Sequence, residues 1–312
     1  MPNVQDIHVD AALTNLSVAS MNPMDAFIAD KVFKKIPSKY RSDKYYVYDQ
    51  SFLLRSEAQE RGSKTLAPIR DHGISNTTFT CKWYSIGELV GWDEIDNADP
   101  IIDPIADAVD VVTQDIMLQR EKLFASTALT TSVWATDYDV TTTGTAWDAA
   151  GADILGDVDT GKQTVATGTG IPEDLLSGVM TADVWNVVKR DADILSGFGG
   201  GDSSKKIATV DHVRQLMGLK ELHIMRAVEN SAIEGAAASY ARVKAEAMLI
   251  YFSPDAPGKK KAAAGYNFVH KDIEISRFAR NEYRADQVEA NSYYVPKVVM
   301  TTAGYYLYNQ LT

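Results

Sequence analysis

Two short strand patterns separated by a long polar stretch constrain the fold of this chain most strongly. Residues 45–48 are aromatic and β-branched, and residues 77–83 alternate apolar and polar side chains, as half-buried strands do. Residues 50–75 between them are mostly polar and charged, and a structureless loop of that length is unusual inside a compact domain. The pattern therefore predicts a protruding β-hairpin that buries little of its own surface.

The segment before this hairpin, residues 1–44, has no clear periodicity. Residues 24–33 could form a short helix, and Pro37 would end it, because the residue before a proline avoids the α region. The first ten residues have neither the basic start nor the apolar run of a signal peptide. We expect this segment to be an extended arm that needs another surface to lie on.

A long amphipathic helix is predicted over residues 104–125. Asp103 is a suitable N-cap, and Pro104 suits the first helical position. Apolar side chains recur along one face at spacings of three, four and seven residues. They are Ile105, Val109, Val112, Ile116 and Leu123. A helix of this length is about 30 Å long, so it would cross most of a domain of this size.

Helical and strand patterns alternate beyond this helix, as in a mixed layer of an α+β fold. The predicted elements are helices at 152–167, 181–194 and 209–217, and strands at 175–180, 222–228 and 247–252. The last fifty residues are mostly strand, over 266–278 and 292–308. Pro296 indicates that part of the second run lies at an edge or a bulge, because proline donates no ladder hydrogen bond.

The composition excludes several classes of protein. A single cysteine among 312 residues cannot form an internal disulfide, a zinc ribbon or an iron–sulfur site. A net charge of −11 argues against a tight grip on a phosphate backbone, which needs an excess of Lys and Arg. No apolar stretch approaches the ~20 residues of a membrane span. We therefore expect a globular protein that is kept in a reducing cytoplasm.

No sequence pattern for catalysis or for metal or cofactor binding stands out. The glycine run at 197–201 lacks the order of a phosphate loop and is followed by Asp202. The five histidines have no paired ligand spacing, and the acidic clusters at 93–99 and 153–159 lack the offsets of a calcium loop. Cys81 is expected to be a small strand residue. No cofactor and no enzyme activity are expected, and a soluble hydrolase with an unrecognised carboxylate site stays open as a distant alternative.

The order of these elements resembles the major capsid protein of tailed double-stranded DNA bacteriophages, which has the Hong Kong 97-type fold. An arm, a long hairpin, a long helix, a mixed α/β segment and a final return of strands follow one another in both. Short sequence signatures are also similar. They lie at residues 19–37, 43–48, 119–125, 134, 169–172, 179–181, 184–185 and 193–194.

The resemblance implies five parts of an α+β chain. They are an N-terminal arm at 1–44, an extended hairpin loop at 45–84, a peripheral domain at 85–174 with its spine helix at about 104–125, an axial domain at 175–265, and return strands of the peripheral domain at 266–312. It also implies a structural protein that self-assembles into the hexamers and pentamers of an icosahedral phage head, with no catalytic step.

Contacts between subunits are then expected on the hairpin and the arm. The candidate contact residues are Arg55, Glu57, Arg61, Lys64 and Arg70 on the hairpin, and Phe27 and Phe33 on the arm. Members of the family can cross-link a hairpin lysine to an asparagine, and Lys64, Asn281 and Asn291 are the residues here that could do so. No spacing pairs them, so an ion pair between subunits is the favoured role for Lys64.

Partners and location also follow from the resemblance. A portal protein is expected, and a decoration protein is an option. Because Met1 directly precedes the arm, we expect a separate scaffolding protein, or none. The acidic charge suits a shell that encloses double-stranded DNA without binding it tightly. The expected location is the virion capsid, assembled in the host bacterial cytoplasm without a membrane. The nearest alternative is an encapsulin, a cellular shell protein with the same fold.

Overall fold

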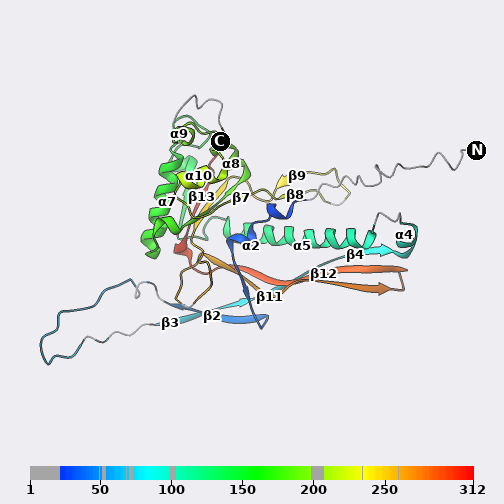
Figure 1. Cartoon of the computed structure of the whole chain (residues 1–312), viewed down its shortest axis with the longest axis horizontal. Coiled ribbons are helices and arrows are strands. Elements are labelled where there is room, and N and C mark those ends of the chain that lie inside the picture. The colour runs from blue at the N-terminus through cyan, green and yellow to red at the C-terminus, as the bar shows by residue number, and fades with distance from the viewer. Residues whose placement is uncertain are drawn as a thin grey trace, which may run out of the picture.

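A computed structural model of the chain shows two β-sheets joined by a long helix, with a hairpin that projects from the body (Figure 1). It describes residues 22–48, 50, 54–67, 69, 73–98, 103–197, 207–233, 235–258 and 260–312. Its short helices are η2 (Met24–Ala26), α2 (Ala29–Val32), α4 (Trp92–Asn97), α6 (Val140–Thr143), η3 (Glu173–Leu175), α9 (Ala192–Ser196) and η5 (Thr301–Ala303).

The first sheet has four strands in the order β1-β11-β12-β4. The strands are β1 (Lys35–Pro37), β11 (Gly265–Arg280), β12 (Ala285–Val298) and β4 (Lys82–Gly91), and only the β1–β11 pair is parallel. Helix α5 (Pro104–Ala128) lies along one face of this sheet (Figure 1). Val112 and Ile116 of the helix are buried against Val90, Val288 and Ala290 of the sheet, so this layer has an apolar core of its own.

Helix α5 begins as predicted and runs three residues longer than predicted. The carboxylate of Asp103 accepts hydrogen bonds from the backbone N–H groups of Ile105 and Ala106, at 3.1 and 3.2 Å. Beyond Ile116 the buried side chains are Arg120, Glu121, Phe124, Ala125 and Ala128, whereas the expected Leu123 is only partly buried. The last turns bury this neighbouring stripe because they pack against the second sheet as well as the first.

The second sheet has five strands in the order β5-β13-β10-β6-β7. They are β5 (Thr136–Asp139), β13 (Gly304–Tyr308), β10 (Ala247–Tyr251), β6 (Ser177–Thr181) and β7 (Leu222–Met225). Alternate residues of the central strands face opposite sides. Met180 and Ile250 belong to one apolar cluster, and Val179 and Leu249 belong to another. Both faces of the sheet are therefore covered, as its continuous apolar runs require.

Helix α7 (Ile154–Thr169) packs on one face of this sheet, with α8 (Ala182–Val188) and α10 (Val210–Leu216) nearby. Gly161 allows the close approach of α7, since a Cβ there would lie 2.7 Å from Ile250 Cδ1 and 2.8 Å from Tyr305 Cδ1. The opposite face packs against α2 and the end of α5. A small ribbon of β8 (Val228–Asn230) and β9 (Tyr240–Arg242) completes this half of the molecule.

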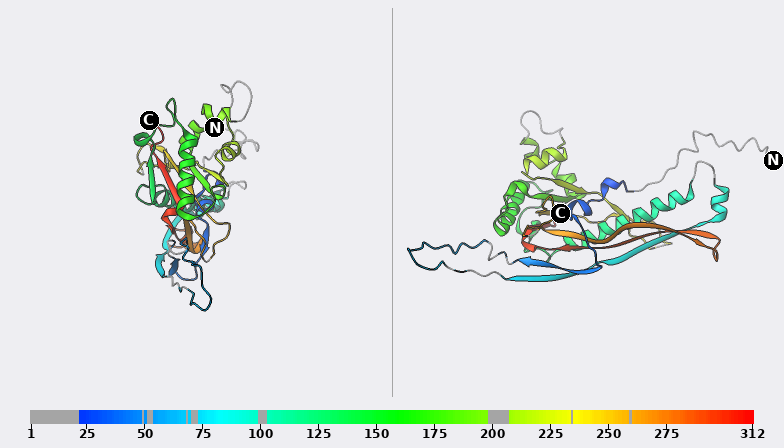
Figure 2. Two further views of the ribbon diagram at one scale, coloured as in Figure 1. Left: turned by 90° about the vertical axis from the view of Figure 1, so that its left-hand side faces the viewer. Right: turned by 60° about the horizontal axis from the view of Figure 1, so that its bottom comes forward.

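The expected hairpin is present, formed by antiparallel strands β2 (Ser42–Tyr48) and β3 (Ile74–Thr80). Its far end extends well beyond the sheets (Figure 2). The single strand predicted at 77–83 is wrong, because the chain leaves β3 at Cys81 and enters the separate strand β4. Strand β2 begins at Ser42, inside the segment assigned to the arm.

The predicted division of the chain after residue 174 does not coincide with the sheets. Strand β5 and helix α7, which precede this boundary, belong to the five-stranded sheet and its core. The predicted strand at 292–308 is two strands, and β13 pairs with β10 and β5 instead of returning to the first sheet. Local periodicity marks strands but does not determine which sheet they join. Pro296 lies beyond the last β12–β4 pair, Tyr294 with Lys82, as its missing N–H predicts.

Candidate assembly surfaces

The far end of the hairpin, residues 55–67, is exposed throughout. Arg55 pairs with Glu57 at 3.4 Å, and Arg61 donates a hydrogen bond to the carbonyl of Thr65. Lys64 has a positive φ of 66°, which turns the chain at the tip. The predicted contact residues Arg55, Glu57, Arg61 and Lys64 therefore lie together on one projecting loop, and Arg70 lies outside the described residues.

Two large apolar side chains are the most exposed in the described part of the chain. Leu66 and Ile69, both near this tip, are 95% and 98% exposed. Side chains of this kind contribute to stability only when another surface covers them. We define Leu66 and Ile69 as the apolar tip. The prediction of contact residues from charge overlooked it, although both residues stand in the polar excursion and were visible in the sequence.

The two predicted contact residues of the arm are core residues of their own subunit. Phe27 and Phe33 are 6% and 1% exposed. The ring of Phe33 meets that of Phe124 edge to face at 5.1 Å and fills the space left by the absent side chain of Gly265. Almost no surface of either ring is left for a neighbour. The expected intersubunit role of Phe27 and Phe33 is therefore corrected to packing within one subunit.

A buried arginine on helix α5 connects the arm to two strands of the first sheet. Arg120, which is 2% exposed, donates to Asp30 at 2.7 Å, to Asp272 at 2.9 Å and to Ser292 at 3.1 Å. Its guanidinium also lies 4.7 Å from the centre of the Tyr294 ring. Asp30 belongs to α2, Asp272 to β11 and Ser292 to β12, so a single side chain on α5 holds three segments distant in sequence.

Lys35 is a second cation beside Asp30 and Asp272. Lys35 Nζ lies 2.7 Å from Asp272 and 3.2 Å from Asp30. Burial would raise the pKa of Asp272, but hydrogen bonds from Lys35 and Arg120 outweigh it and lower that pKa to about 2. Arg120 could have been found in the sequence, because it continues the four-residue spacing of Val112 and Ile116 on the buried face of the helix.

The next residue of the helix, Glu121, caps the N-terminus of α2. One carboxylate oxygen accepts hydrogen bonds from the backbone N–H groups of Ile28 and Ala29, at 3.0 and 2.8 Å. The other oxygen, Oε1, is buried without a hydrogen-bond partner among the described residues. Burial is the largest influence on this group and raises its pKa to about 7, against the opposing effect of the two N–H donors.

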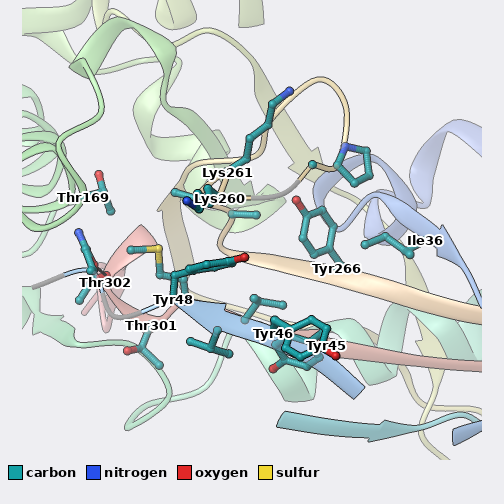
Figure 3. Close-up of a pocket in the computed structure, with 18 of the residues that line it drawn as sticks. Ile36, Tyr45, Tyr46, Tyr48, Thr169, Lys260, Lys261, Tyr266, Thr301 and Thr302 are labelled. Atoms are coloured by element: carbon teal, nitrogen blue, oxygen red, sulfur yellow. Dashed lines mark hydrogen bonds between the residues drawn. The ribbon is translucent and has the colours of Figure 1, made fainter. Parts of the chain in front are cut away.

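A groove of about 1010 Å³ opens at the base of the hairpin (Figure 3). Strand β2 forms one wall, the loop before β11 forms another, and Thr301 and Thr302 lie at one end. The lining is mainly aromatic and aliphatic. Its charged residues in the described part of the chain are Lys260 and Lys261, with no acidic residue among them. Lys260 Nζ lies 5.2 Å from the centre of the Tyr48 ring.

Solved structures of phage capsids share this arrangement. No family model matches the chain. The sequence is 22% identical over 230 residues, 73% of this chain and 71% of the relative, to a protein of Pseudomonas phage JBD67 described as a major capsid protein. The capsid structure of the cyanophage P-SCSP1u matches 97% of this chain and 93% of that one, with a TM-score of 0.65 and 10% identity. The chain has the Hong Kong 97-type capsid fold.

The same capsid fold recurs in a phage-related protein from Bordetella bronchiseptica RB50. Its crystal structure covers 93% of this chain and 94% of its own, with a TM-score of 0.71 and 17% identity. The predicted fold and the resemblance to phage major capsid proteins are thus confirmed. The curated relative is a phage protein, which favours the phage interpretation over the encapsulin alternative. None of the described helices is both long and apolar enough to span a membrane.

Replacing Arg120 with methionine should strongly destabilise this subunit. Methionine retains the aliphatic packing but leaves Asp30 and Asp272 with Lys35 as their remaining cation. Removing one partner from a buried ion network costs about 3 kcal/mol of unfolding free energy. Urea unfolding of unassembled subunits would measure the loss.

Lys122, two residues further along the same helix, provides the control for Arg120→Met. Lys122 pairs with Glu229 at 2.6 Å, but its side chain is about half exposed. Lys122→Met should therefore cost no more than about 1 kcal/mol. Equal losses in the two variants would contradict the structural role assigned to Arg120.

Glu121 should make the subunit less stable as the pH rises. The folded chain keeps this proton up to about pH 7, whereas the ordinary pKa is 4.5, so the folded state holds more protons between these values. Raising the pH from about 5 to 8 should remove about 2 to 3 kcal/mol that Glu121→Gln does not lose. Parallel urea titrations of both proteins would measure this difference, and identical pH profiles would contradict it.

Proposed function

We propose that this chain is the major capsid protein of a tailed phage or prophage. Copies of it assemble into the hexamers and pentamers of an icosahedral head that encloses double-stranded DNA. The observation that carries the proposal is the match of nearly the whole chain to phage capsid subunits, together with a curated relative described as a major capsid protein. The role is structural, and no chemical step is required of the subunit.

The exposed hairpin supports this function independently of the comparisons. A loop that carries Leu66 and Ile69 almost fully exposed gains nothing from the rest of its own subunit. In an assembled shell a neighbouring subunit would cover it. Arg55, Glu57, Arg61, Lys64 and, outside the described residues, Arg70 are the charged groups that would meet that neighbour.

Other partners follow from the same proposal. A portal protein would occupy one vertex, a scaffolding protein would guide assembly, and a decoration protein is an option. Assembly would take place in the host bacterial cytoplasm. The net charge of −11 suits a shell whose inner wall does not hold the genome tightly. A strongly basic inner wall in the assembled shell would contradict this last point.

Size-exclusion chromatography combined with negative-stain microscopy of the purified protein tests the function. We expect closed shells, or isolated hexamers and pentamers that close when assembly conditions are changed. A protein that remains a monomer or dimer under every condition would refute the capsid function and would favour the soluble hydrolase. Terminase and portal genes beside this gene would separate a phage capsid from an encapsulin.

A further inference from the structure

We propose that the contact of Glu121 with the backbone of α2 is a pH-sensitive switch that controls the release of the docked arm. We define the docked arm as residues 22–34, which comprise η2, α2 and the residues around them. Raising the pH through the neutral range should detach this segment from helix α5 more often, while the two sheets stay folded. Every group in this contact belongs to one subunit, so the inference goes beyond assembly and applies to the unassembled protein.

Glu121 supplies a helix cap that the sequence of the arm lacks. Helix α2 has four residues, and its N-cap is Ile28, whose side chain makes no capping hydrogen bond. The first N–H groups of a helix have no partner inside it, so they need an acceptor from elsewhere. Glu121 Oε2 accepts from the N–H groups of Ile28 and Ala29 at 3.0 and 2.8 Å. The start of α2 therefore depends on a carboxyl group from another helix.

The closed contact favours the protonated form of Glu121. The residue is 0% exposed, and its Oε1 has no hydrogen-bond partner among the described residues. Burial is the largest cause of its raised pKa, and the negative charge of Asp30 on α2 adds to it more than Lys31 opposes it. An ionised carboxylate here keeps one oxygen desolvated and unpaired, which is costly. Water reaches both oxygens once the arm detaches, so the ionised form favours the open arrangement.

Other titratable groups lie on the strands that pack around this contact. Against the effect of burial, hydrogen bonds from Lys35 and Arg120 lower the pKa of Asp272 to about 2, so it stays charged between pH 5 and 8. Burial raises the pKa of three tyrosines, which stay neutral. They are Tyr251, Tyr294 and Tyr306. Burial lowers the pKa of His223 on β7 from 6.5, so this histidine needs a control in any pH experiment. The remaining charged groups are Asp30 and Lys31 on α2, Lys35 on β1, Arg120 and Lys122 on α5, Glu221 beside His223, and Glu229 on β8.

The docked arm can detach without disrupting the other two cores that hold the sheets. Its core residues belong to the cluster that it forms with the end of α5 and the five-stranded sheet. They are Ile28, Ala29, Val32 and Phe33. The cluster of α7 with the five-stranded sheet and the cluster of α5 with the four-stranded sheet contain no residue of this segment. The bond from Arg120 to Asp30 also holds the arm, so Glu121 sets how often the arm opens and not whether it can dock.

A uniform loss of stability is the rival explanation. If the arm and the sheets open only together, ionising Glu121 lowers the stability of the whole subunit and no separate release of the arm takes place. Amide hydrogen exchange distinguishes the two cases, because it measures the opening of each segment by itself. The reporter amides of the arm are those of Lys31, Val32 and Phe33, which donate to the carbonyls of Ile28 and Ala29.

Hydrogen exchange of unassembled subunits between pH 5 and 8, followed by mass spectrometry and corrected for intrinsic exchange rates, tests the switch. Protection of the three arm amides should fall by about tenfold or more across this range. At pH 8 these amides should be at least about tenfold less protected than those of the central strand β10. A wild-type arm whose protection does not fall, or equals that of β10 at pH 8, would overturn the inference. This comparison needs no variant.

Two variants assign the pH dependence to one group. Glu121→Gln keeps a neutral acceptor for the N–H groups of Ile28 and Ala29, so its arm protection should not change between pH 5 and 8. His223→Gln removes the other group that titrates in this range and should retain the wild-type fall in protection. A fall that persists in Glu121→Gln, or that disappears in His223→Gln, would overturn the role of Glu121.

Discussion

Val112→Asp is expected to leave no folded subunit. Val112 is 1% exposed and lies in the middle of the contact between α5 and the four-stranded sheet. Its apolar neighbours include Val90, Ile116 and Val288, and none of them can pair with a carboxylate. Burying an unpaired charge costs more than about 4 kcal/mol, a large part of the stability of a domain. Circular dichroism and the yield of soluble protein would show the loss.

The neighbouring valine provides a matched control on the same helix. Val111 is 50% exposed. Val111→Asp introduces the same side chain with a similar loss of helix propensity, so it should fold and assemble. A soluble, assembly-competent Val112→Asp protein would show that the buried face of α5 is assigned incorrectly.

Deleting residues 51–71 and closing the gap with a short turn should give folded subunits that do not form closed shells. The described residues of this segment are exposed and belong to neither sheet core, so the unfolding free energy should change little. Assembly should be lost because the deletion removes the apolar tip and the charged contact residues together. Microscopy and size-exclusion chromatography would report the assembly, and urea unfolding would report the fold.

A glycine-serine loop of unchanged length tests whether assembly needs the side chains of the hairpin loop or only its length. If the side chains of the tip make the contact, replacing residues 55–69 with such a loop should abolish closed shells as fully as the deletion does. Normal shells from the deleted protein would refute an intersubunit role for the hairpin. Normal shells from the glycine-serine protein alone would place the contact in the backbone or in the strands β2 and β3.

Features that depend on nearby residues could be predicted from the sequence. The start of α5 follows from Asp103 and Pro104, whose side chains act within one turn. The hairpin follows from two strand patterns around a polar stretch, and the order of elements was sufficient to indicate the capsid fold. Pro296 correctly predicted an edge position, because its missing N–H is a local property.

Features that depend on distant pairing could not be predicted in this way. The alternation of residues 77–83 gave no sign that the chain changes sheets at Cys81, and residues 304–308 have the same strand pattern whichever sheet they join. The same reason explains why the five-stranded sheet and its core contain residues from both sides of residue 174, since α7 is held by strands that follow it in the chain.

The sequence by itself determined the start of α5, the hairpin, the absence of an internal disulfide and the acidic charge, because each depends on single residues or on neighbours along the chain. Only the tertiary structure decided the roles of individual side chains. Phe33 became a core residue because Gly265 and Phe124 leave it a space. Arg120 holds several segments together because Asp30 and Asp272 are brought to it from parts of the chain that are far apart in sequence. Burial and charge pairing are properties of the folded arrangement, so no local pattern could reveal them.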